Sequence, residues 1–238
     1  MPSLPRYCII QDGDTFHAMW QCHNKDWLFK EDWAKKFYYH LLCKFKDRYQ
    51  VQFYGYTFMD NHVHLTGILT DRYKFSDFFR TVNSLFAREY NRRKRRCGQV
   101  VMDRFKSPSI QTEADLMRVM VYIDLNQKRA AKVVHPKDNR FSSYGFYASS
   151  APDRLITAAP AYLRLGATNQ ERQIAYILMV EEIMKSDWRE KKPYSSNLFI
   201  GDPNWVEAKL RILKEVVRKK RLAWKMKVNR LPNQLAPG

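Results

Sequence analysis

Apolar residues recur at two spacings in the first part of the chain, and these spacings predict an alternation of strands and helices. Residues 7–10 and 16–22 are short apolar and aromatic runs on either side of the turn sequence Asp12-Gly13-Asp14, which predicts two strands. Residues 30–49 contain neither Gly nor Pro and place apolar side chains near helical spacing, so a helix is expected there.

The next segment has the composition of a β-hairpin followed by a helix. β-Branched and aromatic residues fill 51–59, which favours a strand, and the turn residues Asp60-Asn61 separate it from a second strand over 62–69. We expect these two strands to pair. Residues 75–96 then place Phe, Val, Leu and Tyr side chains on one side of a helix.

A strand over 107–111 and a helix from Thr112 to about Ala131 complete this pattern. The order β-β-α-β-β-α-β-α predicts an α+β fold, in which an antiparallel sheet carries helices packed on it. The composition changes near the middle of the chain, so we predict a catalytic or binding domain over 1–150 and a helical, basic region over 151–238. Within the second region, helices are expected over 160–165, 168–186 and 203–228, and a loop over 188–202.

Composition and charge narrow the choice of partner. The 238 residues are 45% hydrophobic and 28% charged, which is typical of a globular protein, and 42 Lys and Arg against 24 Asp and Glu give a net charge of +18. A compact domain must bear this self-repulsion, so we expect a polyanion: nucleic acid first, an anionic membrane surface second. No apolar run approaches the ~20 residues of a spanning helix, and the N-terminal residues lack the pattern of a secretory signal.

The cysteines indicate a reducing compartment. The sequence has four of them, and none forms a Cys-x-x-Cys pair. Neither a zinc ribbon nor a disulfide framework is therefore indicated, and a cytoplasmic location is expected.

The first candidate for chemistry is His62-Val63-His64. Side chains two apart on a strand point to one face, so the imidazoles are expected ~6–7 Å apart along the strand, where they can bind one ion. Two histidines that only line a half-buried strand are the alternative.

The second candidate is Tyr122 with Asn126, whose spacing of four places both on one face of the predicted helix. A phenol can attack a phosphodiester and form a phosphotyrosine ester, provided that its surroundings activate it. The amide oxygen of Asn126 is a further ligand for a hard divalent ion. A packed helical tyrosine with its hydroxyl in water is the alternative.

Basic residues gather in two runs, 88–96 and 209–230, which suit the neutralisation of DNA phosphates. A solvated helix face explains either run taken alone, but the overall charge favours nucleic acid. The residues expected to contact DNA are Arg92, Arg93, Lys94, Arg95, Arg96, Arg104, Lys106, Lys219, Lys220 and Arg221.

Four segments carry recognisable blocks: 59–65 (Met-Asp-Asn-His-Val-His-Leu), 103–107 (Asp-Arg-Phe-Lys-Ser), 122–130 (Tyr-Ile-Asp-Leu-Asn-Gln-Lys-Arg-Ala) and 141–144 (Phe-Ser-Ser-Tyr). In this order they resemble the Met-Pro-Asn-His-x-His-Leu, Gly-Arg-Phe-Lys-Ser, Tyr-Ile-His-Leu-Asn-Pro-Val-Arg-Ala and Trp-Ser-Ser-Tyr blocks of the IS200-like tyrosine transposases. The similarity is greatest to the REP-associated, single-tyrosine HUH group. It spans about residues 5–150, and the helical tail is similar to that of longer members.

The resemblance implies a ferredoxin-like α+β domain with the histidines on a sheet strand and the tyrosine on a helix. It implies that His62, His64 and Asn126 hold a divalent ion, Mg²⁺ or Mn²⁺, and that Tyr122 is the nucleophile. The implied reaction is cleavage and rejoining of single-stranded DNA at REP-like hairpins, through a 5′-phosphotyrosine ester and a free 3′-hydroxyl, in the bacterial cytoplasm. A monomer is favoured over a homodimer, and no membrane association is expected.

Three positions depart from the family's blocks. Asp60 replaces Pro, which is expected to change the turn or to add an outer carboxylate. Asp124 replaces His and Gln127 replaces Pro, so the helix is expected to continue further than in relatives. None of these changes removes a residue that performs the chemistry, but they leave room for a specialised or domesticated protein.

Other classes of protein fit less well. His64-Leu65-Thr66 matches the His-x-Thr motif of two-histidine phosphoesterases, but a second copy is absent from the sequence. The Pro-Cys-x-x-Cys of zinc deaminases and the Walker and Rossmann glycine loops are also absent. The remaining alternative is a catalytically idle protein that binds hairpin DNA, and the intact histidines, Tyr122 and Asn126 favour the enzyme.

Overall fold

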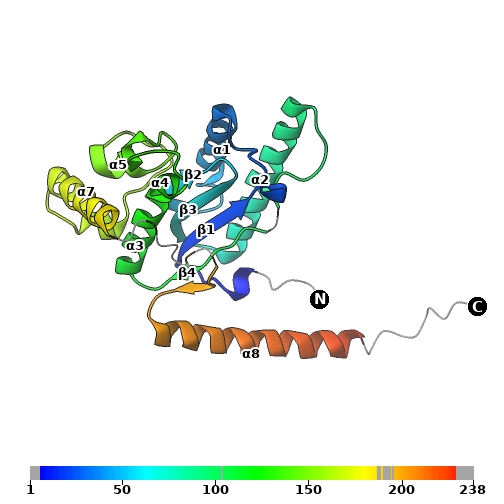
Figure 1. Ribbon diagram of the computed structural model, residues 1–238. Coiled ribbons are helices and arrows are strands. Elements are labelled where there is room, and N and C mark those ends of the chain that lie inside the picture. The colour runs from blue at the N-terminus through cyan, green and yellow to red at the C-terminus, as the bar shows by residue number, and fades with distance from the viewer. Residues whose placement is uncertain (1–5, 103, 187–188, 190–193, 195, 229–238) are drawn as a thin grey trace, which may run out of the picture.

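The computed structural model describes residues 6–102, 104–186, 189, 194 and 196–228 and shows a sheet flanked by helices, with one long helix along the bottom of the view (Figure 1). The strands are β1 (Thr15–Gln21), β2 (Val51–Phe58), β3 (His62–Leu69), β4 (Ser109–Ile110) and β5 (Phe199–Ile200). The α-helices are α1 (Asp32–Phe45), α2 (Arg72–Lys94), α3 (Glu113–Asp124), α4 (Asn126–Arg129), α5 (Tyr144–Ser149), α6 (Pro160–Leu163), α7 (Asn169–Lys185) and α8 (Pro203–Val228). Short 3-10 helices cover Arg6–Cys8, His23–Lys25 and Pro136–Asp138.

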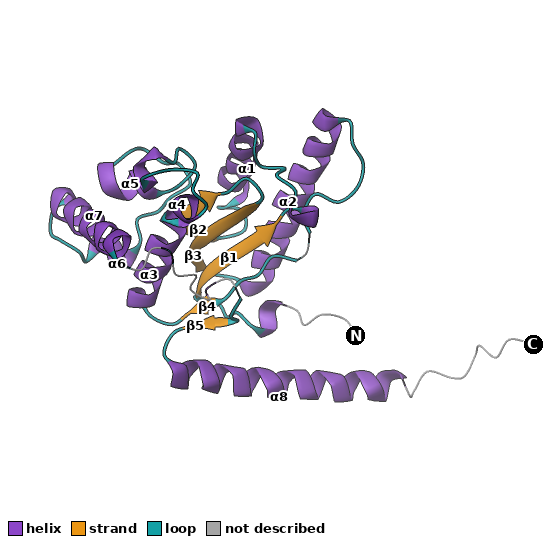
Figure 2. Cartoon of the chain, viewed as in Figure 1, coloured by secondary structure: helices purple, strands orange, loops and turns teal. Residues whose placement is uncertain are grey.

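The sheet has the strand order β2-β3-β1-β4-β5 (Figure 2). β3 pairs antiparallel with β2 on one side and with β1 on the other, and β1 pairs antiparallel with β4. In this register Thr57 and Met19 lie on either side of His64. The predicted hairpin and the α+β architecture are confirmed.

The expectation of a strand over residues 7–10 is wrong. Arg6–Cys8 is a 3-10 helix, and the Arg6 carbonyl accepts the N–H groups of Ile9 and Ile10 at 2.8 and 3.1 Å. Both isoleucine side chains are buried. A short run of apolar residues indicates that the segment is buried, and a compact turn can bury these side chains as well as a strand can.

The expected loop over 188–202 contains a strand within its described residues. Phe199–Ile200 form β5, which pairs parallel with β4, and Gln111 donates its N–H to the Ile200 carbonyl at 2.9 Å. The sheet is therefore mixed at this edge. Two residues are too few to show the alternation by which a strand is predicted. Residues 188, 190–193 and 195 of the expected loop lie outside the described residues.

The alternation of side chains along β1 divides the sheet into two faces. Phe16 points to the face covered by α1 and α2, with its ring centroid 4.6 Å from that of Phe75. His17 points to the other face, with its ring centroid 6.3 Å from that of Tyr122 in α3. One face of the sheet therefore packs against an aromatic core, and the other face holds the candidate site residues predicted from the sequence.

The helix that carries Tyr122 is interrupted earlier than the sequence pattern predicts. Thr112 caps it as expected, but α3 ends at Asp124, and α4 follows after Leu125. Asp124 is fully buried and accepts a hydrogen bond of 2.6 Å from the hydroxyl of Tyr176 in α7. The expectation of one helix to Ala131 is wrong, because the chain turns where the end of α3 is anchored on α7.

The predicted C-terminal helices are confirmed, and they meet the body in two ways. Tyr162 of α6 and Tyr176 of α7 pack on Tyr147 of α5, with ring centroids 4.7 and 5.2 Å apart, and all three belong to the main core. α8 instead contacts the body through Leu213, which lies in a small cluster with Ile9 and β5. Within the described residues, no helix combines the length and the apolar character that crossing a bilayer requires.

Candidate active site and nucleic-acid interface

The two histidines of β3 share one face of the sheet, as their spacing predicts. Their ring centroids are 4.9 Å apart, His64 is 3% exposed, and His62 is half-buried. Val63 between them is fully buried on the opposite face. Burial lowers the pKa of His62 to about 4 and that of His64 well below its ordinary value. Both rings are therefore neutral at neutral pH, which is the form in which an imidazole nitrogen can bind a metal.

A third histidine, His17 of β1, joins this pair and was missed by the sequence analysis. Its Nε2 lies 2.9 Å from Nδ1 of His64, and its Nδ1 lies 3.2 Å from the carbonyl oxygen of Tyr194. The side chain is fully buried, which lowers the pKa of His17 to about 4. Strand alternation could have placed His17 on the face opposite Phe16, but no signal in the sequence shows that β1 lies beside β3.

Tyr122 lies over the histidines on α3. Its ring centroid is 6.2 Å from that of His64 and 6.3 Å from that of His17, edge-on to both. The ring of Tyr194 packs perpendicular to it at 5.1 Å. The structure thus brings the predicted nucleophile and the predicted histidine ligands together, although they are almost sixty residues apart in the sequence (His64 and Tyr122).

Arg129 adds a positive charge to this cluster and was also missed. Its guanidinium carbon lies 4.4 Å from the ring centroid of Tyr122, and Nη1 donates to the Tyr122 carbonyl at 2.7 Å, where the helix is interrupted. Burial lowers the pKa of Arg129, yet a guanidinium stays charged in proteins. Its buried Nε has no hydrogen-bond partner, and no carboxylate pairs with it, among the described residues. This is an arrangement suited to an anion, and Arg binds phosphate well.

The side chains present fit a divalent ion that keeps open coordination positions. His62 and His64 supply two nitrogens, and Asn126 is buried one turn after Tyr122 with an amide nitrogen that has no hydrogen-bond partner in the described chain. No group of three His, Cys, Asp or Glu side chains within the described ranges is placed to hold a metal. The amide oxygen, water and a phosphate oxygen would therefore complete the coordination, as is usual for Mg²⁺ or Mn²⁺.

Asp60 acts as a structural anchor, and its charge also opposes the effect of burial on the pKa of His62. Its carboxylate oxygens lie 2.9 Å from Nζ of Lys35 and 3.0 Å from Nζ of Lys132. Burial raises the pKa of Asp60, but the two lysines outweigh this and hold it below its ordinary value. Gln127 forms a second anchor, since its amide donates to the Phe58 carbonyl at 2.8 Å. Both contacts hold the segment around α4 against the β2–β3 hairpin.

The basic run at the end of α2 is partly neutralised by acids. Glu89 pairs with Arg92 at 2.8 Å and with Arg93 at 2.6 Å, and Lys94 pairs with Glu31. All three basic side chains are exposed. The charge that this end of α2 offers to a phosphate is therefore smaller than the sequence suggests.

Arg95 and Arg96 lie in the turn that follows α2. Arg95 is exposed and adopts a left-handed backbone conformation (φ 48°) that ends the helix, and Arg96 donates to the Gln99 carbonyl at 3.3 Å. This end of α2 lies at the top of the view and α8 at the bottom (Figure 1). The two basic runs therefore lie on separate helices at opposite sides of this view.

The basic residues of α8 are exposed, and one of them also contacts the body. Lys219 and Arg221 point into solvent. The Nζ of Lys220 lies 3.2 Å from the hydroxyl of Tyr7 and 3.0 Å from the sulfur of Cys8. Residues 229 and 230, at the end of the predicted run, lie outside the described residues.

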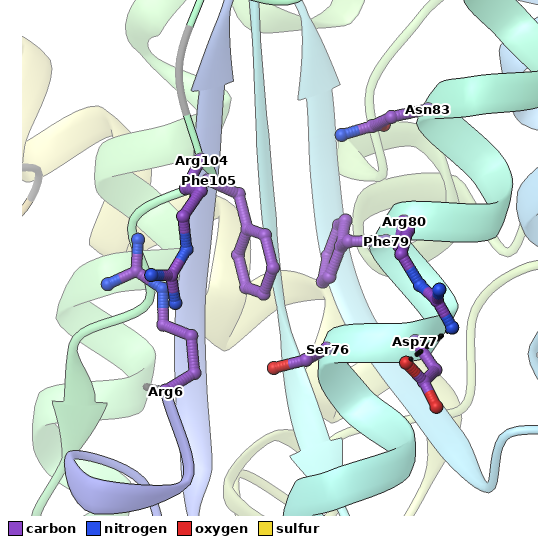
Figure 3. Close-up of a pocket in the computed structure, with 8 residues that line it drawn as sticks. All are labelled: Arg6, Ser76, Asp77, Phe79, Arg80, Asn83, Arg104 and Phe105. Atoms are coloured by element: carbon purple, nitrogen blue, oxygen red, sulfur yellow. Dashed lines mark hydrogen bonds and ion pairs between the residues drawn. The ribbon is translucent and has the colours of Figure 1, made fainter. Parts of the chain in front are cut away.

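A cationic pocket of about 360 Å³ opens on the α2 face of the sheet (Figure 3). The rings of Phe79 and Phe105 face each other inside it, with centroids 4.2 Å apart, and Arg6 and Arg104 extend along one side. Burial and then the charge of Arg104 lower the pKa of Arg6 to about 10. Exposed Lys106 follows directly, whereas Asp103 of the same block lies outside the described residues. The other lining residues are Ser76, Asp77, Arg80 and Asn83.

Comparison with known proteins agrees with this geometry. The model of the family described as "Transposase IS200 like" matches residues 12–126, a stretch that contains both predicted histidine ligands, Tyr122 and Asn126. The chain is also similar to a solved structure of a REP-associated tyrosine transposase bound to a REP hairpin, at 18% identity and a TM-score of 0.53, over 67% of this chain and 93% of that one. No curated protein matches the chain. The resemblance seen in the sequence is confirmed.

Proposed function

We propose that this chain, whose residues 12–126 match the model of the IS200-like transposase family, cleaves and rejoins single-stranded DNA at hairpins. One observation carries the proposal: Tyr122 and the pair His62 and His64 converge on one face of the sheet. A nucleophile beside two neutral metal ligands is what phosphodiester cleavage of this type requires. The similar solved structure holds a REP hairpin, which supports hairpin DNA as the partner.

In the proposed reaction, the oxygen of Tyr122 attacks the scissile phosphorus. The bond from phosphorus to the 3′-oxygen breaks, the 5′-phosphate becomes esterified to Tyr122, and the proton lost by the phenol is balanced by the one gained by the 3′-hydroxyl. A 3′-hydroxyl reverses the step on rejoining. Because the ester stores the phosphodiester bond, no nucleoside triphosphate is consumed.

Arg129 is placed to assist at the phosphate. Its guanidinium lies over the ring of Tyr122 and has an unused buried donor among the described residues. Charge-assisted hydrogen bonds from such a group hold a phosphate and stabilise the negative charge that increases during attack. A divalent ion, Mg²⁺ or Mn²⁺, would polarise the same phosphate when held by His62, His64 and Asn126.

We infer that DNA reaches this site along exposed basic side chains. Arg92, Arg93 and Lys94 already pair with acids, so we expect weaker contributions from them than from Arg95, Arg96, Lys106, Lys219 and Arg221. Arg104 and Lys220 are further basic residues on the proposed path of the DNA. In this proposal residues 1–150 perform the chemistry, and residues 151–238 add the basic helix α8. The protein acts as a monomer in the bacterial cytoplasm.

A denaturing gel with end-labelled hairpin DNA and Mn²⁺ tests the proposal. Wild type is expected to give a slowly migrating covalent adduct, and Tyr122→Phe is expected to bind the hairpin without forming an adduct or a cleavage product. Tyr90→Phe and Tyr144→Phe are matched controls that should behave as wild type. An adduct that persists in Tyr122→Phe would assign the chemistry to another tyrosine. No adduct in wild type, with several hairpins and both metals, would indicate a protein that binds hairpins without cutting them.

A further inference from the structure

We propose that His17 and Asn61 are positioning residues that keep the histidines His62 and His64 in the tautomer whose Nε2 carries no proton. The proposal rests on the metal-binding role given to these two histidines in the proposed function, but it concerns the protein before any ion or DNA binds. A metal binds only the ring nitrogen without a proton, and the hydrogen bond at the other nitrogen decides which one that is.

The first hydrogen-bond relay begins at a backbone carbonyl. The carbonyl of Tyr194 can only accept, so Nδ1 of His17, 3.2 Å away, donates its proton to it. His17 is fully buried, and no described carboxylate bonds to it, so its ring is neutral and its Nε2 can only accept. That Nε2 lies 2.9 Å from Nδ1 of His64. His64 therefore carries its proton on Nδ1, and its Nε2 keeps a lone pair.

The second relay also begins at a backbone carbonyl. Nδ2 of Asn61 donates to the Lys25 carbonyl at 3.2 Å, which determines the orientation of the amide. Its Oδ1 then faces Nδ1 of His62 at 2.6 Å, and an amide oxygen can only accept. His62 therefore also carries its proton on Nδ1 and keeps the lone pair of Nε2.

The two relays explain why three imidazoles lie together without a carboxylate. Both ring nitrogens of His17 are engaged, so it is not a third ligand. Each relay selects one tautomer of one ligand, and the relays start from different parts of the fold. A histidine held in the other tautomer would have to break a hydrogen bond and exchange a proton before an ion could bind.

The tautomers are measurable directly in the metal-free protein. Long-range ¹H–¹⁵N correlation spectra of protein labelled at histidine distinguish a protonated from an unprotonated ring nitrogen, and His→Gln variants assign the six histidines. We expect Nε2 to be unprotonated in His62 and His64 and Nδ1 to be protonated in His17. A proton on Nε2 of either ligand in the wild type overturns the proposal.

Matched variants separate positioning from simple packing. His17→Leu and Asn61→Leu remove a relay and should weaken Mn²⁺ binding, measured by calorimetry, roughly 10–100-fold. His17→Gln can still donate to the Tyr194 carbonyl and accept from His64, so it should retain Mn²⁺ affinity near that of wild type. Asn61→Asp can no longer donate to the Lys25 carbonyl, but its carboxylate still accepts from His62, so it should bind Mn²⁺ at least as tightly as wild type. His135→Gln, away from the site, is the control for loss of a histidine.

The outcomes keep this proposal distinct from the proposed function. Mn²⁺ affinity unchanged in a folded His17→Leu protein overturns the role of His17. If His17→Leu does not fold, the spectra of the wild type and the Asn61 pair decide. A wild type that binds no Mn²⁺ removes the metal from the proposed function, whereas the spectra still confirm or refute the tautomers.

Discussion

Replacing Asp124 with Asn should stabilise the protein most above about pH 7, less between about pH 4 and 7, and hardly at all below about pH 4. Asp124 is fully buried, and burial raises its pKa from 3.8 to about 7 in spite of hydrogen bonds from Tyr176 and Ser143. In the unfolded chain this carboxyl titrates near its ordinary value. The folded protein therefore holds one more proton between about pH 4 and 7, and its stability falls as the pH rises through that interval.

The magnitude follows from the two pKa values. A difference of about three pKa units corresponds to roughly 4 kcal/mol, the most that the ionised carboxylate subtracts from the free energy of unfolding above pH 7. For a chain of this length that is roughly 10 °C in melting temperature. Asn at this position keeps the hydrogen bond from Tyr176 and does not ionise. The buried histidines titrate in the opposite sense, because their pKa values are lowered, and they cancel in the difference between variant and wild type.

Urea unfolding between about pH 4 and 8 measures this difference. The curves of stability against pH should separate progressively for Asp124→Asn and wild type up to about pH 7 and keep a constant separation above it. Asp77→Asn is a suitable control, since Asp77 is an exposed carboxylate 2.9 Å from Arg80 on α2. Curves that stay parallel over the whole range would refute the reasoning, because they would show that the buried carboxyl is no more protonated in the folded state than in the unfolded chain.

Three further predictions concern the site and its surroundings. Asp60→Asn leaves buried Lys35 without its carboxylate and should lower the free energy of unfolding by roughly 1–3 kcal/mol in urea titrations at neutral pH; unchanged stability would contradict the anchoring role. Replacing the three basic residues 219–221 with Ala should reduce the slope of log affinity against log salt by up to about 2 for a single-stranded substrate, and an unchanged slope would identify a solvated helix face. Arg129→Lys keeps the charge but loses the planar fork, so single-turnover cleavage should slow roughly 10²–10³-fold at similar hairpin affinity; an equal loss of binding would argue against contact with the phosphate.

The sequence predicted correctly those helices and strands that extend over long runs of residues with a consistent pattern. The hairpin, α1, α2 and the C-terminal helices follow from runs of consistent composition or helical spacing, and the shared face of His62 and His64 follows from strand alternation alone. The position of Tyr122 over them did not follow from spacing; it was implied by the family's blocks. Composition and spacing describe one element at a time, whereas this contact depends on how α3 crosses the sheet.

The features that were missed depend on contacts between distant segments. His17 acts on His64 only because β1 pairs with β3, and Arg129 reaches Tyr122 because the helix is interrupted after Asp124. β5 is a strand only because β4 lies beside it. The sequence of each segment contains no signal that shows which distant segment will lie beside it.

The three departures from the family's blocks support an intact site on structural grounds. Asp60 is held by two lysines, Asp124 by Tyr176, and Gln127 by the Phe58 carbonyl. Each replacement residue thus has its own partner, and the three contacts connect the turn before the histidines, the end of α3 and α4 to the rest of the fold. The three replacements therefore hold the segments that carry His62, Tyr122 and Asn126 against the rest of the fold, so the departures from the family's blocks do not disrupt the arrangement of these side chains.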